Sequence, residues 1–226
     1  MDGVSRRGAL AAVVAASGVV AGCVGGGTGD GSADGDPPSL DSHPAGRDVD
    51  EQPRFGPPPG DGRGTIVAFE DPSCPRCAAF ERETVPRIRS ALADPGDATF
   101  VFRLYPNVSP WGKPASRALE ATYARDADAH WALADRYFST QSAFDGENVL
   151  DRTRTFLDAE TTVDGAAVVS EVRSGDADSP VEADVAAATD AGVNATPTVF
   201  LFRGGTYRTK VVGSVSYAVV TNALGL

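Results

Sequence analysis

Two of the chain's three cysteines, Cys74 and Cys77, are separated by two residues in the stretch DPSCPRC. Thiols at this spacing can contribute to a metal site, form a structural disulfide or act as a redox couple. A disulfide across two residues closes a very short loop, and short loops give little stabilisation. The spacing therefore favours a working redox couple over a structural disulfide.

A metal site is the weaker interpretation of the pair. Zinc needs four ligands, so His43 and His130 would have to join the two cysteines. His43 falls in a low-complexity stretch, and His130 on an apolar helical face is typical of a partly buried structural histidine. Two thiolates can also hold Cu(I), but Met1 is the only methionine that could assist. We predict no metal and no cofactor beyond a redox-active Cys74–Cys77 disulfide, with Cu(I) binding as an alternative.

The segments around the pair predict a strand, a turn and a helix. The β-rich run TIVAFE occupies 65–70, and helix-forming residues follow over 75–92. Pro75 suits the first turn of a helix, and Pro86 should kink the same helix. Cys74 then lies at the helix N-terminus, where unpaired N–H groups and the helix dipole favour a thiolate.

The two cysteines should therefore differ in reactivity. Arg76 adds a permanent positive charge, so Pro75 and Arg76 are the residues expected to tune the redox pair. Cys77, one turn into the helix, should be shielded from solvent. We predict that Cys74 is the exposed nucleophile and that Cys77 is the resolving cysteine.

The remainder of the chain alternates between strand and helix patterns. A second strand is expected at 98–106, and helical periodicity dominates an insert over about 114–190. Two strands at 196–203 and 206–213 follow, joined by two glycines, and a last helix begins near Ser216. The predicted order is β-α-β, a helical insert and β-β-α, which is an α/β fold.

Three stretches together carry a family resemblance: FEDPSCPRC, HWALADRYF and GVNATPTVFLF. The chain from about 64 to 226 resembles the DsbA-like thiol-disulfide oxidoreductases, which have a thioredoxin fold with a helical insertion. The resemblance implies that Pro197 is the family's cis-proline and that Thr196 and Pro197 present backbone to a substrate chain. It also implies cysteine-containing exported proteins as substrates and a membrane redox partner that recycles the pair.

The sequence departs from the family pattern at two places. Many members carry a buried acid six residues before the first cysteine, where this chain has Ala68. Glu70 has the same strand parity and is a candidate for proton transfer, although its place at a strand end predicts solvent exposure. Strongly oxidising members often have Pro-His between the cysteines, whereas this chain has Pro75-Arg76. The pair could therefore oxidise substrates or, as the alternative, reduce or isomerise their disulfides.

The first 23 residues are typical of an export signal. Arg6 and Arg7 resemble a twin-arginine signal, and the apolar run behind them is too short to span a bilayer. The run ends in VAGC, which resembles a lipobox with Cys23 as the lipidated residue. These features predict a lipid-anchored protein on the extracytoplasmic side of the cell membrane.

Residues 24–63 are rich in Gly, Pro, Asp and Ser and contain eight acids against three bases. Such a composition lacks apolar surface to bury, so we expect a disordered tether that spans roughly 35 Å. The folded domain is then expected to cover 64–226.

The whole chain of 226 residues has a formal charge of -11, with 18 arginines but only Lys113 and Lys210 as lysines. An acidic surface of this kind indicates a protein adapted to concentrated salt, a halophilic composition. It offers no basic stripe for nucleic acid. Without a separate dimerisation segment, a monomer is expected.

Overall fold

The computed structural model describes residues 36–226. The predicted signal, the lipobox and residues 24–35 of the predicted tether lie outside this part of the chain. Between residues 36 and 226, no helix combines the length and apolar character that crossing a bilayer would require.

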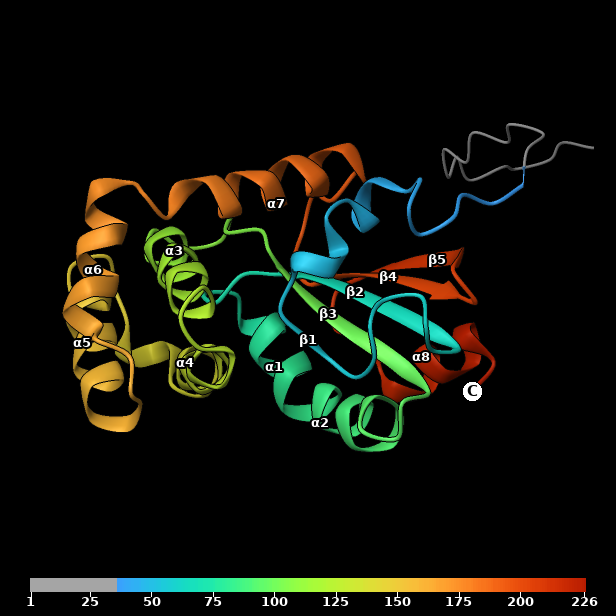
Figure 1. The fold of residues 1–226 in the computed structure, drawn as a ribbon, viewed down its shortest axis with the longest axis horizontal. Coiled ribbons are helices and arrows are strands. Elements are labelled where there is room, and N and C mark those ends of the chain that lie inside the picture. The colour runs from blue at the N-terminus through green and yellow to red at the C-terminus, as the bar shows by residue number, and fades with distance from the viewer. Residues whose placement is uncertain (1–35) are drawn as a thin grey trace, which may run out of the picture. The chain divides into compact units, whose positions relative to one another are not determined.

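A five-stranded sheet in the order β1-β3-β2-β4-β5 forms the centre of the fold (Figure 1). Its strands are β1 (Arg54–Phe55), β2 (Gly64–Glu70), β3 (Ala98–Leu104), β4 (Thr198–Arg203) and β5 (Thr206–Val212). Strands β2 and β3 are parallel, β4 is antiparallel to β2, and β5 is antiparallel to β4. This arrangement is the predicted α/β thioredoxin fold, and β1 is an additional edge strand that the sequence did not indicate.

Eight α-helices surround the sheet in residues 36–226 and fall into two groups along the chain (Figure 1). Those packed beside or following the sheet are α1 (Pro75–Glu83), α2 (Val85–Ile88) and α8 (Tyr217–Leu224). The helical insertion contains α3 (Gly112–Tyr123), α4 (Ala127–Ser139), α5 (Val149–Glu160), α6 (Gly165–Ser174) and α7 (Asp178–Asp190).

Two of the predicted helices are interrupted. The helix expected over 75–92 stops at Thr84 and resumes as α2, because Pro86 has no N–H to donate. At this break in the helix, the Thr84 hydroxyl donates a hydrogen bond to the Val215 carbonyl at 2.9 Å. The start of the helical insert expected from about residue 114 divides into α3 and α4, since Asp126 caps the second helix by accepting from Ala129 N–H at 2.8 Å.

Both faces of the sheet are covered, and every residue of β2 is buried. Ile66 and Ala68 belong to the apolar core that includes α1 and α8, whereas Val67 and Phe69 belong to a second core on the opposite face. Because a strand buried on both faces has no polar side, residues 66–69 of β2 form a continuous apolar run.

The second face corrects the prediction of a disordered tether through residue 63. Leu40, Ala45 and Val49 are buried in the second core together with residues of α7. The Leu40 N–H donates to the Gly205 carbonyl at 2.7 Å, and the His43 ring stacks on Tyr207 at 4.9 Å. The ordered domain therefore begins by residue 36, and His43 is a packing residue.

A buried arginine also holds this N-terminal segment in place. Arg103 on β3 donates to the Ala45 carbonyl at 3.2 Å and to the Arg47 carbonyl at 2.6 Å. Its charge is balanced by Asp184 on α7, with a 2.7 Å ion pair between side chains that are each 1% exposed. The segment is ordered because a distant strand supplies the donors and the sheet supplies the apolar surface, neither of which is visible in its own composition.

Candidate active site

The cysteine pair lies at the carboxyl end of β2, where the chain turns into α1. Cys74 is the residue that precedes the first turn of α1, and Pro75 is its first helical residue. Both thiols are free in this structure. Cys77 is fully buried, one turn into the helix, as the sequence predicted.

The exposure of Cys74 differs from the prediction. The residue is only 4% exposed, because the Thr196–Pro197 loop lies over it. Its sulfur still borders solvent, since Cys74 lines an open groove of about 470 Å³ together with Arg76, Val108 and Thr196. This groove offers a substrate sulfur an approach to Cys74.

The proline loop meets the cysteine pair directly. The Thr196–Pro197 peptide bond is cis, and the Cys74 Sγ lies 3.3 Å from the Thr196 carbonyl oxygen. The structure thus brings together Cys74, Cys77, Thr196 and Pro197, which are far apart in the chain. Thr196 and Pro197 are themselves buried, and their expected contact with a substrate chain stays a prediction.

The surroundings of Cys74 favour its thiolate and lower its pKa to about 6. The largest contribution is a hydrogen bond from the Cys77 thiol, which outweighs the opposing effect of burial. The Thr196 side chain and the backbone N–H groups of Cys77 and Arg76 add to it. Arg76 therefore acts on the sulfur through its backbone, whereas the sequence predicted an effect of its side-chain charge.

Cys77 has the opposite electrostatic environment. Burial raises the pKa of its thiol, and donation to Cys74 and the nearby charge of Glu70 raise it further. The Asp71 N–H, 3.5 Å from the Cys77 sulfur, only partly offsets these effects. Cys77 is thus held as a thiol while Cys74 ionises.

Glu70 is fully buried, contrary to the predicted exposure. Neither of its carboxyl oxygens has a hydrogen-bonding donor within the described residues. Burial, followed by the charge of Glu81, raises the pKa of Glu70 well above its usual range. The end of β2 is buried because α1 returns across it, so strand position alone gave the wrong exposure.

Asp71 is a buried residue of the site that the sequence analysis missed. Its carboxylate accepts hydrogen bonds from the Ser73 N–H and hydroxyl at 2.7 and 2.6 Å, and from the Asn107 and Val108 N–H groups, both at 2.8 Å. A Cβ at Gly112 would lie 2.5 Å from this carboxylate, so only glycine fits there. The Asp-Pro-Ser pattern of an Asx turn was the available signal.

The helical insertion supplies a second missed residue, Gln141. Its amide nitrogen donates to the Pro72 carbonyl at 2.8 Å and to the Cys74 carbonyl at 2.9 Å. Gln141 thereby fixes the turn that carries Cys74. Nothing local in the sequence indicates this contact.

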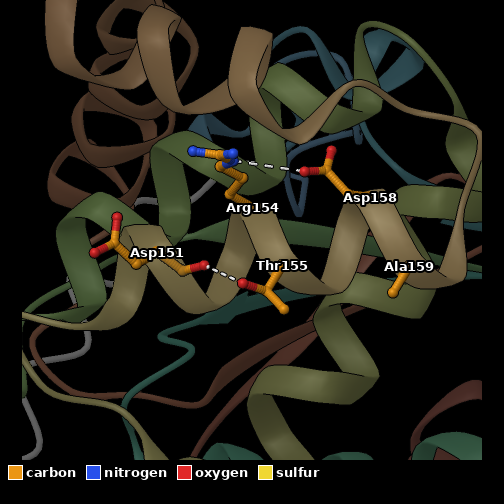
Figure 2. A pocket seen from close by; sticks show the side chains of 5 residues that line it. All are labelled: Asp151, Arg154, Thr155, Asp158 and Ala159. Carbon is orange, nitrogen blue, oxygen red and sulfur yellow. Dashed lines mark hydrogen bonds and ion pairs between the residues drawn. The ribbon is translucent and has the colours of Figure 1, made fainter.

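Other candidate groups do not join the site. His130 is fully buried with its Nδ1 3.0 Å from the Leu119 carbonyl, and burial lowers its pKa to about 4. Figure 2 shows a hollow along α5, where Arg154 pairs with Asp158 at 3.6 Å and the Thr155 hydroxyl donates to the Asp151 carbonyl. These are the ordinary contacts of an exposed helix, so the chemistry of residues 36–226 is concentrated at the cysteine pair.

Comparison with known families agrees with this geometry. A family model described as Thioredoxin matches residues 60–206, and the chain belongs to that family. Its five-stranded sheet and helical insertion are also the fold of the solved structures named below.

The chain is also similar to individual proteins. The chain is 28% identical over 76 residues to the probable disulfide bond formation protein D of Bacillus anthracis, covering 34% of this chain and 35% of that protein. The match thus spans about a third of the curated relative's length. BdbD from Bacillus subtilis, in its oxidised crystal structure, has a TM-score of 0.68 and 21% identity, covering 85% of this chain and 97% of that one. DsbA2 from Pseudomonas aeruginosa has a TM-score of 0.63 and 23% identity, covering 76% and 92%. At these identities, the solved structures establish a shared fold.

Proposed function

We propose that this protein is an exported thiol-disulfide oxidoreductase that forms disulfides in other exported proteins through Cys74 and Cys77. The observation that carries the proposal is the position of the Cys74 sulfur at a helix N-terminus, in an open groove and beside a cis-proline loop. With its pKa lowered to about 6, Cys74 is mainly a thiolate at neutral pH. A thiolate this stable is both a nucleophile and a good leaving group.

In the oxidising direction, a substrate thiolate attacks the Cys74 sulfur of the Cys74–Cys77 disulfide. A bond forms between the substrate sulfur and Cys74, and the Cys74–Cys77 bond breaks with its electron pair on Cys77. A second substrate thiolate then attacks the substrate sulfur of this mixed disulfide, and Cys74 leaves as the stabilised thiolate. The substrate is oxidised to a disulfide, and the cysteine pair is reduced.

The surface around Cys74 suits an extended protein segment. Val108 and Val212 are 50% and 53% exposed, and both flank the site: Val108 lines the groove, and Val212 pairs with Thr198 beside the cis-proline. Exposed apolar side chains at a groove are typical of a surface that binds other proteins. Arg76 adds an exposed positive charge to the same groove.

The lowered pKa of Cys74 supports the oxidising direction over reduction or isomerisation. A stabilised thiolate stabilises the reduced form and raises the reduction potential. A pKa of about 6 lies between the values of about 7 for thioredoxin and about 3.5 for DsbA. We therefore expect a potential between about -270 and about -120 mV. A value at the thioredoxin end would reverse the assignment to reductase or isomerase.

In the cell, the protein would be held at the membrane by a lipid anchor and would work with a membrane redox partner. Arg6, Arg7 and Cys23 support export by the twin-arginine route and lipid attachment at the extracytoplasmic face of the cell membrane. A membrane redox partner would reoxidise the pair, and the protein would act as a monomer in concentrated salt. Cys23→Ser should release the protein from membranes into the soluble fraction; retention of the variant on membranes would contradict lipid attachment.

Trapping of substrates tests the exchange mechanism. Cys77→Ser should accumulate mixed disulfides between Cys74 and exported proteins, because the resolving thiol is missing. Cys74→Ser is the matched control and should accumulate none; the reverse pattern would exchange the two roles. Stoichiometric Cu(I) binding by a protein that exchanges no disulfides would instead support a copper-binding protein.

A further inference from the structure

The surface around the Cys74 sulfur is almost free of charge. The groove that contains Cys74 is lined by the start of α1 and by parts of two loops, 105–110 and 192–197. A third loop, 212–216, contacts the first turn of α1. None of the three loops contains an acidic or basic residue, in a chain of which 23% of the residues are charged. The charge of this groove therefore depends on the residues of α1 alone.

Arg76 supplies that charge. Apart from the Cys74 sulfur itself, it is the only ionisable residue that lines the groove within residues 36–226. Its side chain is exposed, and its guanidinium has no hydrogen bond or ion pair with another described residue. Its backbone is fixed in the first turn of α1, where the Arg76 carbonyl accepts from the Ser214 hydroxyl at 2.9 Å. A guanidinium held in this way is available to a ligand, and its planar fork matches a carboxylate.

No carboxylate of the described residues competes for Arg76 in the groove. The other lining residues are neutral, and among them Asn107, Val108 and Asn194 are exposed. Asp71, the nearest acid in the sequence, is buried and already accepts four hydrogen bonds. In a chain with a formal charge of -11, this groove is thus a place where an acidic segment meets a cation.

An acid next to a substrate cysteine slows disulfide exchange unless a cation offsets it. A neighbouring negative charge disfavours ionisation of the substrate thiol, and only the thiolate attacks a disulfide. A cation that pairs with the acid favours the thiolate again. Arg76 and Cys74 are two residues apart and line the same groove, so a side chain beside the substrate cysteine comes near the guanidinium when the two sulfurs meet.

We propose that Arg76 selects substrate segments that carry a carboxylate within one or two residues of the reactive cysteine. The inference rests on the proposed exchange at the cysteine pair and names its preferred substrates. The segment lies in the groove with its sulfur at Cys74, its acidic side chain on the Arg76 guanidinium and a neighbouring apolar side chain on Val108. A segment with a lysine in place of the acid meets the guanidinium as a like charge and binds more weakly.

A single-turnover measurement with matched peptides tests this selection. Each peptide contains one cysteine, joined by a disulfide to an aromatic thiol that absorbs visible light when released, and the residue beside this cysteine is Asp, Asn or Lys. The Cys74 thiolate of the reduced protein attacks the peptide sulfur, a disulfide forms between these two sulfurs, and the aromatic thiolate leaves with the electron pair. The product is the same mixed disulfide that forms in substrate oxidation. Dividing each rate by the rate with a small uncharged thiol removes the effect of the flanking residue on the peptide itself.

The expected result is a preference that depends on one side chain. The aspartate peptide should react about tenfold faster than the lysine peptide, as one attractive and one repulsive contact at a partly exposed site would give. Arg76→Gln should bring this ratio close to one, and Arg76→Glu should reverse it. Because the ratio compares peptides on the same protein, a change in the pKa of Cys74 does not affect it. Arg82→Gln removes an exposed arginine of the same helix that lies outside the groove, and this matched control should keep the tenfold ratio.

The outcomes distinguish this inference from the proposed function. If the wild-type protein reacts equally with the three peptides, or if Arg76→Gln keeps the preference for aspartate, the selection by Arg76 is overturned while the exchange at Cys74 stands. Loss of the preference in Arg82→Gln as well would also overturn it, because the overall charge of the protein would then be responsible. If no peptide releases the aromatic thiol faster with the wild-type protein than with Cys74→Ser, the proposed function itself fails.

Discussion

Cys74 and Cys77 lie one helical turn apart, yet the two regions that surround them have opposite effects. On the groove side, hydrogen-bond donors from Cys77, Thr196 and two backbone N–H groups stabilise the Cys74 thiolate. On the core side, burial and the carboxyl group of Glu70 disfavour ionisation of Cys77. The contrast shows that position relative to the first turn of α1 and to the core, and not the CxxC spacing, decides which sulfur reacts.

The largest expected difference is in alkylation. At pH 7, Cys74 of the reduced protein should react with iodoacetamide more than about 100-fold faster than Cys77, because only thiolates react. The Cys74 rate should rise with pH around a midpoint near 6. Peptide mapping by mass spectrometry measures the alkylation rate at each cysteine. The denatured protein, in which both thiols are exposed to the reagent, provides the control. Equal alkylation rates of Cys74 and Cys77 in the folded protein would show that the fold does not distinguish the two thiols.

Asp71 should matter next, because it joins the two regions. Asp71→Ala leaves four donors of the active-site turn and the Asn107–Val108 loop without their acceptor. We expect a loss of about 3 kcal/mol in the free energy of unfolding and weaker binding of substrate peptides. Chemical denaturation and peptide titration measure the two effects. Asp128→Ala, on an exposed helical turn, is the control; a loss of similar size there would show that the Asp71 contacts contribute little.

The pH dependence of stability sharpens the comparison further. The folded pKa of Cys74 is about 6, against an ordinary value of 9.0. The group therefore stabilises the reduced protein fully above pH 9, and this stabilisation is lost as the pH falls through 6. The melting temperature of the reduced protein, relative to the oxidised protein, should rise from pH 6 to pH 9. A flat difference would mean that the thiolate is not stabilised by the fold.

The smallest effect on stability is expected at Gln141, a residue of the helical insertion that supports the active-site turn. Gln141→Ala removes two hydrogen bonds to carbonyl groups of the active-site turn. The expected loss is about 1 kcal/mol, since water can replace part of these bonds at the surface. Ser142→Ala, at the next and exposed position, should have no effect on denaturation midpoints. A loss of several kcal/mol would mean that the insertion is essential to the turn.

The local patterns of the sequence predicted much of this fold. The strand at 65–70, the helix that follows the cysteines and the strands at 196–203 and 206–213 correspond to β2, α1, β4 and β5. The two-residue strand β1 was missed, because so few residues give a weak periodicity. That residues 36–63 are ordered was missed for a different reason: the residues that this segment contacts lie on β4, β5 and α7.

The sequence by itself determined the reactive pair and its place at a helix start, because both depend on neighbours within a few residues. The proline that faces the pair was implied by the family resemblance. Only the tertiary structure decided the environment of the two sulfurs. Gln141 reaches Cys74 across 67 positions, Thr196 does so across 122, and Glu70 is buried only because α1 returns across the end of β2. Burial and long-range hydrogen bonds are properties of the packed chain, so no local pattern could assign them.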